Sequence, residues 1–419
     1  MLLKYLGALL FFLMMVAPFD FYEVKISILV LILIHKLIFT LKSRTLGLSS
    51  PVFFWFCGII CFGLFFTFWS LLFPYSTING VLKILPVYVL WPFVYLLIIP
   101  YLMDERVFIL INNTMVYGAL FISIYLILSF LSIIGLVPIP FDKFTLVKPI
   151  LGRSESSEVQ MFMPAVTSLL FLNPFLLSNL LFGITKKNHL GKLWIFMAFL
   201  LSTIAIFISG RRSLVLNILI SPIVLFVFIK LSRVELSKQE RKMILKVMLI
   251  LLISGSVLLS MLSFLELIDF NSVWEFFVEG FDLRSSGNDE SSSLRGDQLH
   301  LLTQSWKDYP VFGSGLASHS QYIVRSEDMP WMYELSFMAW LFQTGIIGLL
   351  IFLSLLMWVF IKSIMIIKNN SNRSFLIPFL VGSLCFLVGC TSNPYLQAFD
   401  HLWAIYLPVG MLNYYLLKT

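Results

Sequence analysis

The residues of this 419-residue chain best suited to chemistry are arginines placed at the ends of apolar runs. Arg211 and Arg212 stand in the sequence Ser209-Gly210-Arg211-Arg212-Ser213, between two such runs. A guanidinium group offers five N–H donors that match phosphate oxygens, and a helix opening at Arg212 would add its N-terminal dipole. The pattern predicts an anion site. Two arginines that merely extend from helix ends into a polar interface would give the same pattern, so both interpretations stay open.

A third arginine, Arg295, lies near the start of a predicted amphipathic helix over residues 294–307, which Ser291–Ser293 would cap. A cation is unfavourable close to a helix N-terminus, so the position indicates a specific anionic partner for Arg295. The alternative is a helix that lies at a membrane surface with Trp306 as its anchor.

Glu334 stands at the mouth of the next apolar run, just before Ser336. A partly desolvated carboxylate there is suited to proton transfer, which makes Glu334 a candidate general base; capping of the following helix is the alternative. His300, His319 and His401 show neither metal-ligand spacing nor a carboxylate relay, and we predict surface or interfacial positions for them.

The composition places these residues in a membrane protein. Hydrophobic residues make up 59% of the chain and charged residues 12%, and the mean hydropathy is +0.94. The net charge of +7 is scattered between apolar runs, which argues against nucleic-acid binding. All four cysteines lie inside apolar runs, and nucleotide and zinc motifs are absent from the sequence, so we expect no disulfide, metal or other cofactor.

The apolar runs predict an all-α integral membrane protein with about 12 transmembrane helices, because each needs roughly 20 residues to cross the bilayer. The predicted spans are residues 2–18, 23–41, 52–74, 81–102, 107–136, 161–183, 192–209, 214–231, 244–264, 336–361, 375–391 and 402–417.

Basic residues in the short loops favour cytoplasmic N- and C-termini. We expect nine spans with short loops in residues 1–264, one large external loop with short helices in residues 265–335, and the last three spans in residues 336–419. Residues 137–160 form a smaller external segment under this assignment. A long hydrophilic loop of this kind is usually functional.

Three motifs together resemble the O-antigen polymerase (Wzy) and O-antigen ligase superfamily of bacterial surface-polysaccharide enzymes. They are S-G-R-R-S at 209–213, R-G-D-Q-L-H-L-L-T-Q-S-W-K-D-Y-P-V-F-G-S-G at 295–315, and E-L-S-F-M-A-W-L-F-Q-T-G-I-I-G at 334–348. The resemblance implies a GT-C-like fold in the bacterial inner membrane. It also implies a glycosyltransferase that takes undecaprenyl-diphosphate-linked oligosaccharides as donors at the periplasmic face without metal or nucleotide.

The resemblance places the substrate diphosphate on Arg211, Arg212 and Arg295, where positive charge would stabilise the leaving group, with Arg295 and Glu334 as the catalytic residues. Many ligases of the superfamily carry a His-Asn pair eleven residues before the first glycine of the G-x-x-G element. Here that position holds Glu334, followed by Leu335, which favours a polymerase. Membrane lipid and a chain-length regulator protein are the further partners that the family implies.

Two alternatives remain. An O-antigen ligase that transfers finished polymer to lipid A core would use the same anion site. A polysaccharide transporter or flippase would need ionisable residues along its spans, which here are nearly free of charge apart from Lys25, His35, Lys36 and Lys83 near their ends.

Overall fold

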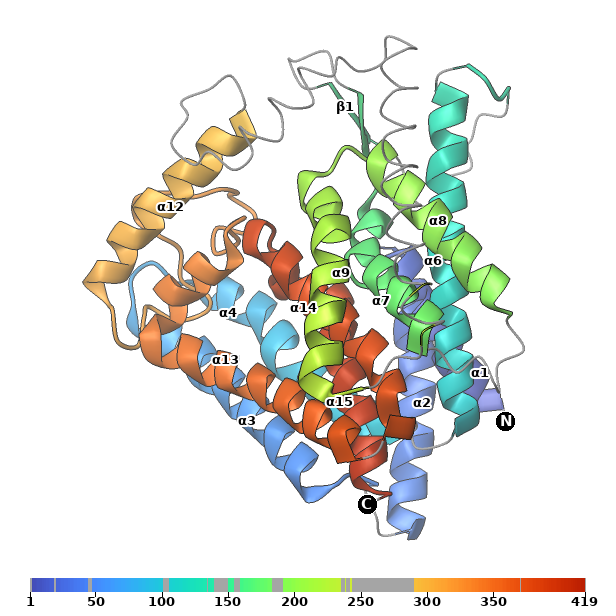
Figure 1. Ribbon diagram of the computed structural model, residues 1–419. Coiled ribbons are helices and arrows are strands. Elements are labelled where there is room, and N and C mark those ends of the chain that lie inside the picture. The colour runs from blue at the N-terminus through green and yellow to red at the C-terminus, as the bar shows by residue number, and fades with distance from the viewer. Residues whose placement is uncertain are drawn as a thin grey trace. The chain divides into compact units, whose positions relative to one another are not determined.

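The chain is nearly all helical, as its composition predicts (Figure 1). The computed structural model describes residues 2–18, 20–43, 47–100, 105–133, 135–138, 150–153, 159–182, 191–234, 238, 242, 290–369 and 371–418. The predicted span at 244–264 and the first part of the large loop, residues 265–289, lie outside the described residues.

The helices follow the predicted spans closely. Their bounds are α1 Leu2–Val16, α2 Tyr22–Ser43, α3 Ser50–Trp69, α4 Ile78–Leu85, α5 Trp91–Ile98, α6 Glu105–Ile133, α7 Leu169–Phe182, α8 Lys192–Ile208, α9 Arg212–Ser232, α12 Glu290–Asp308, α13 Ser336–Asn369, α14 Ile377–Gly389 and α15 Trp403–Leu416. A π-helical turn, Pro86–Leu90, joins α4 to α5. Two short antiparallel strands, β1 (Ile150–Arg153) and β2 (Val159–Phe162), pair in the smaller external segment, where the sequence predicted no strand.

Eight helical segments of the described chain are long and apolar enough to cross a membrane, which agrees with a multi-pass membrane protein. They are Tyr22–Lys42, Ser50–Leu72, Ile78–Ile98, Arg106–Ile133, Pro164–Phe182, Arg212–Ser232, Ser336–Asn369 and Ser374–Ser392. Two further apolar helices, Lys4–Val16 and Lys192–Ile208, are shorter. The total of about 12 spans remains a prediction.

The helices form two compact units that interleave along the chain. The first unit comprises Met1–Thr114, Leu294–Ile366 and Phe386–Thr419, and the second comprises Met115–Ser293 and Ile367–Cys385. In the second unit α7 packs against α8 and α9, and buried amides link these helices: Asn173 Nδ2 donates to Ser202 Oγ at 2.8 Å, and Asn217 Nδ2 donates to the Leu170 carbonyl at 2.7 Å.

The core of the first unit forms where α3 runs alongside α13 (Figure 1). Trp55 Nε1 of α3 donates to the Leu355 carbonyl of α13 at 2.7 Å, and the rings of Phe62 and Trp340 stack at 5.6 Å. The Leu355 carbonyl thus receives a side-chain donor within an otherwise apolar contact. This pairing holds the start of α13 in place.

Helix α13 is interrupted at Gly345, whose φ of 64° lies in the left-handed region. The backbone nitrogens of Ile346 and Ile347 donate to the carbonyls of Pro310 and Val311, at 3.0 and 3.2 Å. A Cβ atom at Gly345 would lie 2.2 Å from the Val311 oxygen, so only glycine fits. The break lets the segment after α12 dock into α13 and sets the first part of α13, from Ser336, at its own angle.

Two predictions need correction. Helix α12 begins at Glu290, so Ser291–Ser293 lie inside its first turn and do not cap it. His401 is 1% exposed and not a surface residue, because its ring packs against the rings of Phe386 and Tyr395 in the turn just before α15. Lys25 lies near the start of α2, in agreement with its predicted place near the end of a span, and it is buried. Its ammonium lies 3.3 Å from Asp400 Oδ1 and donates to the Ala17 and Pro18 carbonyls.

Candidate functional site

The described part of the large loop brings α12 back against the start of α13. Leu302 of α12 packs in a buried cluster with Tyr333, Ala339 and Phe342, and the apolar side chains of Trp306, Ile323 and Met338 cover this cluster. The helical spacing that puts Leu302 on this face of α12 puts Arg295 two turns earlier on the same side. Apolar packing therefore carries Arg295 to the mouth of α13.

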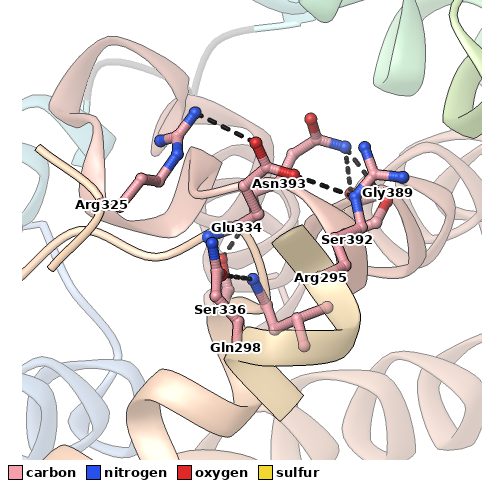
Figure 2. Close-up of polar contacts among 9 residues, drawn as sticks. Arg295, Gln298, Arg325, Glu334, Ser336, Gly389, Ser392 and Asn393 are labelled. Carbon is pink, nitrogen blue, oxygen red and sulfur yellow. Dashed lines mark hydrogen bonds and ion pairs between the residues drawn. The ribbon is translucent and has the colours of Figure 1, made fainter. Parts of the chain in front are cut away.

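At that mouth the Glu334 carboxylate is held between two guanidinium groups (Figure 2). Arg295 Nε donates to Glu334 Oε2 at 2.9 Å, and Arg325 Nη2 lies 3.2 Å from Glu334 Oε1. The side chains are 20%, 33% and 14% exposed for Arg295, Arg325 and Glu334. The site is thus shielded enough to strengthen charge interactions and open enough for a ligand to reach it.

The backbone around Glu334 is fixed by Gln298, one turn after Arg295 on α12. Gln298 Oε1 accepts hydrogen bonds from the Glu334 and Leu335 backbone nitrogens, at 2.9 and 3.4 Å. Ser336 Oγ donates to the Asn393 carbonyl at 2.7 Å (Figure 2). The two Gln298 bonds satisfy N–H groups just before the start of α13, and the Ser336 bond connects the site to the polar segment after α14.

The loop that carries Arg325 is anchored by the buried hydroxyl of Tyr333. This hydroxyl accepts from the Ser320 backbone nitrogen at 2.7 Å and donates to the Ile323 carbonyl at 3.1 Å. Burial raises the pKa of Tyr333, which keeps the hydroxyl protonated as a donor. Ser305 Oγ of α12 adds a hydrogen bond to Ser320 Oγ at 2.7 Å. The loop is therefore attached to α12 only a few residues before Arg325.

Arg211 and Arg212 belong to the second unit and are described within it. Gly210 adopts a φ of 63°, Arg211 is the N-cap residue of α9, and α9 begins at Arg212 as predicted. The Arg211 carbonyl accepts from the Leu214 and Val215 backbone nitrogens, at 3.0 and 3.2 Å. The two arginines thus lie at a helix N-terminus, where the peptide dipoles favour an anion.

The structure brings together two of the predicted residues, Arg295 and Glu334, and adds two that the sequence did not single out. Gln298 follows Arg295 at a spacing of three, which on a helix means the same face, so this signal was available. Arg325 lies in a stretch without helical or strand periodicity, and its pairing with Glu334 depends on how the loop folds.

The arrangement is suited to anion binding. Two guanidinium groups and one carboxylate leave an excess of positive charge, and guanidinium groups prefer phosphate or carboxylate oxygens. Each oxygen of Glu334 faces one guanidinium group and has a further lone pair, so the carboxylate can still accept a hydrogen bond from a substrate hydroxyl. Among the described residues no cluster of three or more His, Cys, Asp or Glu side chains could hold a metal ion.

Residues 197–353 match the family model of the O-antigen ligase domain (Wzy_C). The match covers less than half of the chain, but it includes the turn at Ser209–Ser213, all of α12, and the site formed by Arg295, Arg325 and Glu334. No curated protein matches the chain. The matched region is therefore similar to a domain of the O-antigen polymerase and ligase superfamily.

Proposed function

We propose that this multi-pass membrane protein is a glycosyltransferase that polymerises undecaprenyl-diphosphate-linked repeat units of a surface polysaccharide at the periplasmic face of the bacterial inner membrane. The observation that carries the proposal is the Arg295–Glu334 pair, which lies within the O-antigen ligase-like region and at the mouth of an apolar helix. A site at that level is within reach of a substrate whose lipid tail stays in the bilayer.

The donor would bind through its diphosphate. Arg295 would hold phosphate oxygens by charge-assisted hydrogen bonds and would stabilise the negative charge that grows on the diphosphate as it leaves. Arg211 and Arg212 are further candidates for this role, based on their sequence motif and on their place at the start of α9.

The acceptor would be a sugar hydroxyl of a second lipid-linked unit. Its oxygen forms a bond to the anomeric carbon of the donor, and the bond between that carbon and the phosphate oxygen breaks. The lipid diphosphate leaves with the electron pair, and the hydroxyl proton moves to the Glu334 carboxylate. A single displacement of this kind inverts the configuration at the anomeric carbon.

A polymerase is favoured over a ligase by the residues at the base position. Glu334 and Leu335 stand where the resemblance places His and Asn in many ligases. The alternative is a ligase that transfers polymer to lipid A core. The two activities predict different lipopolysaccharide patterns in a strain that lacks this protein: single repeats attached to core after loss of a polymerase, and no repeats attached after loss of a ligase.

The direct test of the site is Arg295→Ala in the complemented deletion strain. We expect a loss of polymer of about a hundredfold or more, as when one donor to a developing anion is removed. Arg325 still neutralises Glu334 in this variant, so the protein should reach the membrane at its normal level. Lys307→Ala, on the exposed end of the same helix, is the matched control and should leave the pattern unchanged. Normal polymer from Arg295→Ala would remove Arg295 from the mechanism.

A further inference from the structure

The Arg325 guanidinium is held in place by its loop before any ligand binds, although no sequence motif marks it. Its loop is held on one side by the Tyr333 hydroxyl and on the other by Lys83, whose ammonium donates to the Asp328 carbonyl at 3.1 Å. Gln343 Nε2 of α13 donates to the Trp331 carbonyl at 2.9 Å. A cation on a loop fixed at this many points loses little freedom when it binds a ligand.

Most donors of the two guanidinium groups are not used by Glu334. Arg295 contacts it through Nε, and Arg325 contacts it through Nη2. Each guanidinium carries five N–H donors. The donors that do not face Glu334 have no hydrogen-bond partner among the described residues. Arg295 and Arg325 thus share one small carboxylate that cannot satisfy both groups.

We infer that Arg325 is a second diphosphate-binding residue beside Arg295, and that Glu334 is an internal anion which the donor diphosphate displaces from both guanidinium groups. This inference rests on the proposed function. In the free site Glu334 keeps the two cations close together despite their repulsion. In the occupied site the diphosphate takes their donors, and the carboxylate turns to the acceptor hydroxyl.

The charges support this exchange. The free site carries two positive charges and one negative charge. A sugar diphosphate bound to lipid at its other end adds two negative charges, which leaves an excess of one negative charge. When Glu334 takes a proton from the acceptor hydroxyl, this sum does not change, because the negative charge passes to the lipid diphosphate as it leaves and lies next to the two guanidinium groups. Donor binding would thus release the base only when a leaving group is in place, which would protect the lipid-linked glycan from premature attack.

Binding of inorganic pyrophosphate to the purified full-length protein tests the inference by calorimetry at low salt. Arg325→Gln should weaken binding about tenfold or more, because it removes charge-assisted contacts. Arg325→Lys keeps the charge without the planar fork and should retain part of the affinity. Lys307→Ala removes a cation from the exposed end of α12 and should bind as the unaltered protein does.

The effect of Glu334 separates exchange from a purely structural ion pair. Glu334→Gln removes the competing anion at nearly constant shape, so pyrophosphate should bind several-fold more tightly although polymer is lost. Asp297→Asn removes the same charge from an exposed neighbour on α12 and controls for long-range electrostatics, which salt screens. Thermal unfolding of every variant checks that the fold is retained.

Three results would overturn the inference: wild-type affinity in Arg325→Gln, wild-type polymer in an Arg325→Gln strain, or a gain in Glu334→Gln no larger than that of Asp297→Asn. A different result would refute the proposed function alone. If the deletion strain made normal polysaccharide while pyrophosphate binding followed the pattern above, the anion site would stand and the polymerase assignment would fall.

Discussion

Gln298 offers a sharp test of how the site is positioned, because it contacts the backbone of the catalytic segment and not the reacting atoms. Its side chain is fully buried, and its Oε1 accepts the Glu334 N–H at 2.9 Å and the Leu335 N–H at 3.4 Å. Gln298→Leu keeps nearly the same volume but removes the acceptor, so it should leave no cavity.

The size of the effect expected for Gln298→Leu follows from the shorter of these two hydrogen bonds. A buried N–H that loses its acceptor costs about 1–3 kcal/mol, and the bond at 3.4 Å adds little. The backbone can recover part of this cost by moving Glu334 toward water. If the whole cost appears in the placement of Glu334, polymerisation should slow by about 5-fold to 150-fold, since about 1.4 kcal/mol corresponds to a factor of ten.

The assay is the initial rate of polymer formation from lipid-linked repeat units in membranes that contain equal amounts of each variant. Gln304→Leu is the matched control, because Gln304 lies on the same helix with an exposed side chain. Pyrophosphate affinity should change little in Gln298→Leu, since both guanidinium groups remain. Equal rates for the Gln298 and Gln304 variants would refute the positioning role.

Three further predictions follow from contacts near and beyond the site. Tyr333→Phe removes a buried hydroxyl with two loop hydrogen bonds and should lower the free energy of unfolding by about 1–3 kcal/mol, measured by thermal or denaturant unfolding in detergent. Burial raises the pKa of Asp400 to about 7 against the opposing charge of Lys25. The folded protein then holds a proton that the unfolded chain has released, so stability should fall as pH rises from about 4 to about 7. Asp400→Asn should flatten this part of the stability profile, and an equal slope in both proteins would contradict the assignment. In a cysteine-free background, Glu327→Cys should react with a membrane-impermeant maleimide from the periplasm, and Lys368→Cys should not; the opposite pattern would invert the proposed orientation.

The sequence alone predicted the helices well, because hydrophobic runs and helix-start residues act locally. The described helices agree with the predicted spans, and α9 begins at Arg212 as expected. Local patterns misplaced the start of α12, where three serines suggested a cap but lie within the first turn. Serine is common at caps, yet tertiary contacts can extend a helix past it.

Only the tertiary structure decided which residues form the site. Arg295 and Glu334 are 39 positions apart, and Arg325 joins them from a loop with no periodic pattern. The burial of His401 likewise depends on the helices packed around it. Hydrophobic periodicity predicts the secondary structure of one segment, whereas these contacts join segments that are far apart in the sequence. Their positions depend on the break at Gly345, the docking of the segment after α12, and the apolar packing of Leu302 against Tyr333.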